Sequence, residues 1–334
     1  MNVAEVRQLQ QFRDEIAPRH VHHVKLVLLR PPSTKPIPRS SSESNVALLK
    51  LSAILPLLPN VVRAELQATR WSFSSEDDLA SPSQSLPKIV SDFLGLRLCT
   101  LHLFGLLGEP GIASFIHHCP NLVTLYLSFD EGYSTAHPLD TLRSLRRLQS
   151  LHLVWFNRTD DARDGLDGSL DRLTAKADRT LLLSRLHHSH TLPIEIGVPF
   201  VSHFASSLQD LEMTFEPPNS SFPPHLIPIH LPGLTRFVTD IAQLPLMVHY
   251  LRLRETPIIH LELTSLNAPE EIWRPLLALV RDLRSTLQTL FIFEVSQMTM
   301  SRGPGPWFSF SDVYKELEGS CTAQGVGLGY EEED

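Results

Sequence analysis

The 334-residue sequence has few cysteines and no long apolar run, and each scarcity excludes a class of protein. Cys99, Cys119 and Cys321 lie far apart, which is typical of a reduced compartment and not of a disulfide framework. No stretch of about 18 apolar residues predicts a membrane span. Residues 1–16 also lack the apolar core of a signal peptide. We therefore expect a cytoplasmic or nuclear protein.

Basic charge and catalytic motifs are scarce as well. The formal net charge is -8, whereas general nucleic-acid binders need clustered Lys and Arg. No nucleophile elbow, phosphate-binding loop or zinc-protease motif occurs. The histidine groups at 20–23, 117–118 and 187–190 lack the spacing of converging zinc ligands, and we interpret the last group as a solvated loop. The sequence thus predicts no enzyme, no metal, no cofactor, and no nucleic-acid or membrane partner.

What the sequence does contain is a recurring frame, L-x-x-L-x-L, with apolar residues at positions one, four and six. The frame begins at Val21, Val61, Leu98, Leu122, Leu148, Leu208, Leu234, Ile258 and Leu287. Start-to-start spacings are 122−98 = 24 and 148−122 = 26 in one run. In a second run they are 234−208 = 26, 258−234 = 24 and 287−258 = 29. A period of about 20–29 residues is that of leucine-rich repeats.

The segments between the frames complete the repeat. Residues 45–58, 112–118, 138–148 and 271–283 carry apolar side chains at helical spacing. A single strand-and-helix unit cannot bury its apolar face, whereas stacked units share one continuous core. We predict an α/β leucine-rich-repeat solenoid over residues 21–330, a curved horseshoe with irregular repeats and loop insertions.

The spacing is interrupted most strongly between two of the frames, where 208−148 = 60. We interpret the charged residues 157–191 in this gap as an insertion. A degenerate repeat around Leu192–Ile196 is the alternative. The acidic residues 331–334 are expected to form a tail.

The irregular repeats, with Pro-Asn at 59–60 and 120–121 before two strands, resemble the leucine-rich half of fungal F-box proteins. Residues 313–327, which contain Cys321 and Gly325, are similar to the last helix of that family. The resemblance implies a substrate receptor of a ubiquitin ligase, in which the F-box binds the adaptor subunit of a cullin ligase.

This sequence departs from the family pattern at its beginning, because the first frame starts at Val21 and no F-box is recognisable. Residues 6–18 resemble the linker helix that follows an F-box, and we predict a linker-like helix over 1–20. The adaptor would then be a partner only through an F-box upstream. A truncated F-box protein, a standalone scaffold or inhibitor, and a GTPase-activator-like regulator are the open alternatives.

Side chains alternate along a strand, so residues between the buried frame positions are expected to line the concave surface. His102, Tyr126 and His152 fall on three successive strands and predict a polar-aromatic patch, of the kind that tyrosine favours at interfaces. The partner is expected to be another protein. The full set of predicted partner-binding residues is Lys25, Arg63, Glu65, His102, Tyr126, His152, Glu212, Arg236, His260 and Glu262.

The strand register can be tested with two adjacent substitutions. Leu125→Asp should unfold the chain locally, because burying an unpaired charge costs several kcal/mol. Tyr126→Asp, one residue along, should leave the fold intact because its side chain lies on the opposite face. Thermal melting of both variants checks this, and an equal loss of stability in the two would contradict the register.

Overall fold

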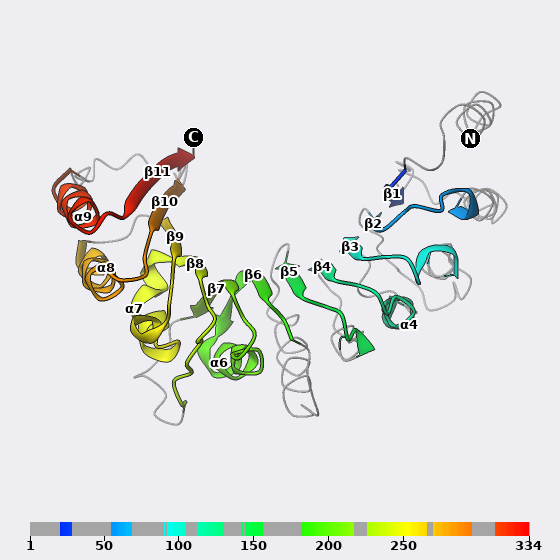
Figure 1. Ribbon diagram of the computed structural model, residues 1–334, viewed down its shortest axis with the longest axis horizontal. Coiled ribbons are helices and arrows are strands. Elements are labelled where there is room, and N and C mark those ends of the chain that lie inside the picture. Colours follow the sequence, from blue (N-terminus) through cyan, green and yellow to red (C-terminus); the bar gives the residue numbers. More distant parts are fainter. Residues whose placement is uncertain are drawn as a thin grey trace, which may run out of the picture. The chain divides into compact units, whose positions relative to one another are not determined.

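In the computed structural model, the chain is an α/β protein whose strands are all parallel to their paired neighbours (Figure 1). The chain divides into two compact units, residues 1–181 and 182–334. Among the described helices, none combines the length and the apolarity that spanning a bilayer requires. The described residues are 21–28, 55–68, 90, 92–104, 112–129, 142, 144–155, 182–216, 226–265, 270–295 and 311–333.

Unit 1 contains parallel strands that neighbour one another in chain order. A 3-10 turn, η2 (Leu55–Leu57), precedes the second strand, and helix α4 (Ile112–His117) precedes the fourth. The predicted helix at 138–148 is described only at 142 and 144–148, where the chain forms 3-10 and turn conformations. The strands are β1 (His23–Leu28), β2 (Arg63–Ala68), β3 (Thr100–Phe104), β4 (Thr124–Phe129) and β5 (Ser150–Trp155).

The apolar frame explains the register of these strands. Leu101 is the Cα partner of Leu125, which in turn partners Leu151, and all three side chains are fully buried. Each fully buried leucine stabilises the fold by about 1.5–3 kcal/mol relative to an exposed one. A register slip of one residue would turn every leucine of a strand away from the core, so this alignment is strongly favoured.

Unit 2 has the same parallel, sequential order and a fuller set of helices. Helices α7, α8 and α9 pack side by side along one side of its strands (Figure 1). Its elements are β6 (Arg185–Pro193), α6 (Ile194–Ser202), β7 (Asp210–Glu216), β8 (Arg236–Asp240), η4 (Ile241–Gln243), α7 (Leu244–Tyr250), η5 (Leu253–Glu255), β9 (His260–Ser265), α8 (Glu270–Asp282), β10 (Thr289–Val295), α9 (Ser311–Gln324) and β11 (Gly327–Glu333).

Strand β6 corrects the prediction that residues 157–191 form an insertion, since it begins at Arg185. Leu183, Leu186 and His188 occupy positions one, four and six of the frame, so the interval of 60 divides into 183−148 = 35 and 208−183 = 25. The interpretation of 187–190 as a solvated loop is wrong, because these residues belong to β6 and the His188 side chain is only 2% exposed. The remainder of the predicted insertion, like the predicted helix over 1–20, lies outside the described residues.

The alternative repeat around Leu192–Ile196 is also wrong in detail. Leu192 lies near the end of β6, and Ile194 begins helix α6. Pairing with β7 shifts between His187 and Thr191, which leaves extra residues on β6. Such a bulge locally interrupts the ladder and bends the strand.

Strand β11 corrects the prediction of an acidic tail, since it extends to Glu333. It pairs in parallel with β10 over its whole length, including Glu331 with Phe293. Backbone hydrogen bonds hold this pairing, and they do not depend on the type of side chain.

Gly197 in α6 offers a test of the packing in unit 2. A methyl group there would overlap the Phe215 ring, with Cδ1 2.8 Å away, whereas one at Gly319 in α9 would have no neighbour within 4 Å. Gly197→Ala should therefore destabilise the protein by about 1–3 kcal/mol through overpacking.

Gly319→Ala is the matched control and should be neutral or stabilising by up to about 1 kcal/mol, because alanine favours helix. Chemical denaturation measures both changes, and Phe215→Leu should restore part of the stability that Gly197→Ala loses. A stabilised Gly197→Ala variant would contradict the packing of α6 on β7.

Candidate functional site

The strand face of unit 1 carries three stacked aromatic rings. His102, Tyr126 and His152 are Cα partners on β3, β4 and β5, as the sequence predicted. Ring centroids lie 3.9 Å apart in both pairs, with interplanar angles of 28° for His102–Tyr126 and 16° for Tyr126–His152. Because strands are spaced about 4.8 Å apart, the rings lean into contact. Such pairs contribute about 0.5–1.5 kcal/mol each beyond burial.

Stacking determines which parts of the three rings are accessible to solvent. Tyr126 lies against one face of the His102 ring, and Phe104 lies near it with ring centroids 6.0 Å apart. His102 is only 8% exposed, so the prediction of an exposed side chain is wrong for this residue. His152 is oriented by a hydrogen bond of 2.9 Å between its Nε2 and Ser150 Oγ. The two histidine rings cover both faces of the Tyr126 ring, so the ring edge is the accessible part of this half-buried side chain.

The buried imidazole of His102 is held neutral. The pKa of His102 is lowered to about 4, mainly by burial. The positive charge of Arg63 also lowers this pKa, and its effect is larger than the opposite effect of the Glu65 carboxylate. The Nε2 atom of His102 is buried and has no hydrogen-bond partner within the described part of the chain. Buried polar atoms are rarely left unpaired, so this nitrogen marks an incompletely satisfied position in the row.

The stacked row continues into charged residues on β1 and β2. Lys25 and Glu65 form an ion pair, and His23 Nε2 lies 3.9 Å from the other carboxylate oxygen of Glu65. The hydrogen bond from Lys25 is the main reason that the pKa of Glu65 is lowered. Arg63 is exposed and forms no ion pair with a residue in the described ranges of unit 1.

The strand face of unit 2 is built around Arg236. Its Nε and Nη2 donate to the two carboxylate oxygens of Glu262 over 2.9 and 2.8 Å, and its Nη1 donates to Asp210 Oδ1 over 2.9 Å. The hydrogen bonds to Glu262 are the main cause that raises the pKa of Arg236. Bidentate arginine–carboxylate pairs fix geometry as well as charge, so this cluster is rigid.

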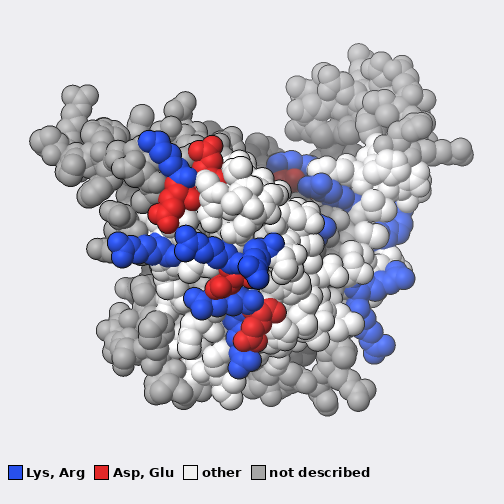
Figure 2. Space-filling model, turned by 60° about the vertical axis from the view of Figure 1, so that its left-hand side comes forward, with Lys and Arg blue, Asp and Glu red and all other residues white. Residues whose placement is uncertain are grey.

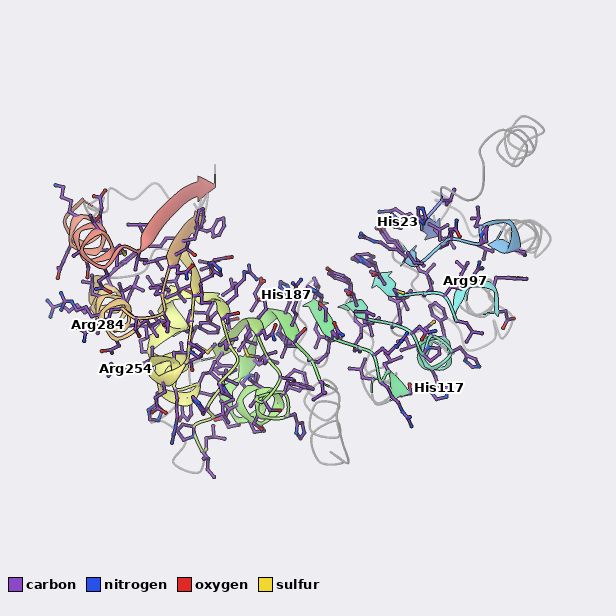
Figure 3. The ribbon with its side chains drawn as sticks, in the orientation of Figure 1. His23, Arg97, His117, His187, Arg254 and Arg284 are labelled. Atoms are coloured by element: carbon purple, nitrogen blue, oxygen red, sulfur yellow. The ribbon has the colours of Figure 1, made fainter. Side chains whose placement is uncertain are left out.

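The remaining predicted residues of unit 2 have other partners. Glu212 Oε2 lies 2.6 Å from His187 Nδ1, and His260 Nδ1 lies 2.7 Å from Thr289 Oγ1 (His187 is labelled in Figure 3). Asp210 and His187 were not among the predicted binding residues. His187 was missed because strand β6 was not predicted. The sequence does place Asp210 beside Arg236 in a mixed-charge stretch, and the register confirms that the two residues are Cα partners.

The described residues include no group of three or more His, Cys, Asp or Glu side chains that could hold a metal ion. Several of their charged groups instead form ion pairs between neighbouring strands. A scan against protein-family models finds no match for the chain, and a search of curated proteins finds no similar sequence.

The protonation of His102 can be measured directly. In an NMR titration, the chemical shift of the proton on its Cε1 atom should change with a midpoint at about pH 4. This lies well below the ordinary histidine pKa of 6.5, because burial disfavours the charged form. The unfolded chain takes up this proton nearer pH 6.5, so the contribution of His102 to stability is lost as the pH falls from about 6.5 to 4.

His102→Phe keeps an aromatic ring and removes the titrating group. Between pH 7 and pH 5 this variant should lose less stability than the natural protein. A midpoint near 6.5 for His102, or an unchanged acid sensitivity in the variant, would contradict the burial of this ring.

Proposed function

We propose that the chain is a leucine-rich-repeat solenoid that binds another protein through the strand faces of its two units. Two properties support the repeat: the apolar frame coincides with the described strands, and each strand pairs in parallel with its neighbour in the sequence within each unit. Repeat solenoids present large, pre-ordered surfaces that lose little entropy on binding.

The observation that carries the proposal is the row of stacked rings in unit 1. Tyr126 and its two histidine neighbours are held in fixed positions by mutual stacking. Rigid aromatic side chains with polar edges give binding energy at low entropic cost, because little side-chain freedom remains to be lost.

The role that this surface suits is substrate or partner recognition, similar to the leucine-rich half of a fungal F-box protein. In that role the chain would be cytoplasmic or nuclear, and would contact the ligase adaptor only through an F-box upstream. A standalone scaffold or inhibitor uses the same surface without the ligase, and the experiment below separates the two.

Affinity purification of the tagged protein from its own cells tests the proposal. A Tyr126→Ala/His152→Ala variant should recover at least about tenfold less of the partner, since truncating anchors of an interface costs about 2 kcal/mol or more. The matched control is Arg254→Ala/Arg284→Ala, whose side chains are exposed in unit 2, with Arg284 beside α8 and projecting away from the strands (Figure 3). This control should recover the partner at the natural level.

The identity of the recovered proteins then assigns the role. A cullin-ligase adaptor among them indicates a ubiquitin-ligase receptor, and a partner without the ligase indicates a standalone scaffold. Equal recovery with the natural protein and the ring variant, at equal thermal stability, would contradict binding through this face.

A further inference from the structure

The strand face of unit 1 holds an arginine, Arg63, that forms no ion pair with a carboxylate among the described residues of that unit. Arg63 is exposed on β2, and the acid two residues along, Glu65, is already engaged by Lys25 and His23. The arginine at the centre of unit 2 is the opposite case, because Glu262 and Asp210 accept hydrogen bonds from three of its nitrogens. The positive charge of Arg63 is therefore open to a partner.

The groups beside Arg63 suit an anion. Its Cα partner on β3 is Thr100, and Thr124 follows in the same row on β4, so two threonine hydroxyls lie along the sheet from the guanidinium. His102, two residues along β3 on the same face, stays uncharged partly because Arg63, His23 and Lys25 already make this region positive. Hydroxyl groups donate to carboxylates, and arginine binds them with two parallel hydrogen bonds.

The neighbouring rings restrict the class of anion. Nucleic-acid surfaces present ring faces on which bases stack, whereas the faces of the Tyr126 ring are covered by His102 and His152. Polar ring edges are instead suited to the amide and carboxylate groups of a polypeptide.

We propose that Arg63, with Thr100 and the edge of Tyr126, receives the carboxylates of an acidic peptide segment on the partner. This inference rests on the proposed function and names the chemistry of what is bound. The Arg63 guanidinium pairs with one carboxylate, and the ring edges hydrogen-bond to the peptide beside it.

The exposed arginines of unit 2 provide an internal contrast. Figure 2 brings forward the side on which α7, α8 and α9 lie, and there basic and acidic side chains are interleaved. Arg254 pairs with Asp282 over 3.1 Å, and Arg281 pairs with Glu316 over 3.5 Å. Arg284 is exposed on this mixed surface, so it matches Arg63 in type and exposure while lacking the hydroxyl row and the rings.

The experiment measures binding of a fluorescein-labelled peptide of alternating Glu and Ala residues to the full chain at low salt, by fluorescence anisotropy. Arg63→Glu should weaken binding by at least about tenfold, which corresponds to roughly 1.4 kcal/mol. Arg284→Glu changes the net charge equally and should leave the affinity within about twofold. Added salt should weaken binding, because it screens exposed charges.

Several results would overturn the inference. They are the absence of peptide binding to the natural chain, equal weakening by Arg63→Glu and Arg284→Glu, and tighter binding of a Lys-Ala peptide or of a single-stranded oligonucleotide. The partner captured in the purification above separates this failure from that of the proposed function. If Arg63→Glu still captures the partner and Tyr126→Ala/His152→Ala does not, only the acidic-peptide inference is rejected. If both variants still capture the partner, the proposed binding face is rejected as well.

Discussion

The burial of one apolar frame per strand is the constraint on which the rest of each unit depends. Leu101, Leu125 and Leu151 are fully buried and aligned on successive strands. This alignment fixes the cross-strand neighbour of each residue beside them on the same strands. Because side chains alternate along a strand, fixing the leucines also fixes which residues meet on the opposite face. The contact of Tyr126 with two histidines is therefore a consequence of core packing, as much as of any attraction among the rings.

The same constraint acts in unit 2 and gives a different surface. Leu211, Phe237 and Leu261 align in the core, and this brings Arg236 between an aspartate and a glutamate on the neighbouring strands. Partly buried ion pairs of this kind contribute specificity more than stability, since desolvation offsets much of the attraction. Unit 1 thus presents stacked rings beside Arg63, which has no ion-pair partner in the described ranges of that unit, while unit 2 presents a satisfied charge cluster.

The strands and their register could be predicted from the sequence because leucine spacing reports the core directly. The frame did not reveal strand β6, because His188 occupies its sixth position, where the pattern requires an apolar residue. It also failed for the burial of His102, because the covering rings belong to residues on other strands. The pairing of Glu65 with Lys25 follows from the register, because the two residues are Cα partners on β1 and β2.

The difference between Arg63 and Arg236 bears on where recognition energy can come from. An arginine already bound to two carboxylates gains little from a third, because a further acidic group would meet a net negative cluster. Arg63 is exposed and has no ion-pair partner within the described part of unit 1, so its donors stay available. The adjacent stack is already ordered, so association loses little conformational entropy. Recognition of an acidic segment therefore belongs to unit 1, where charge and rigidity coincide.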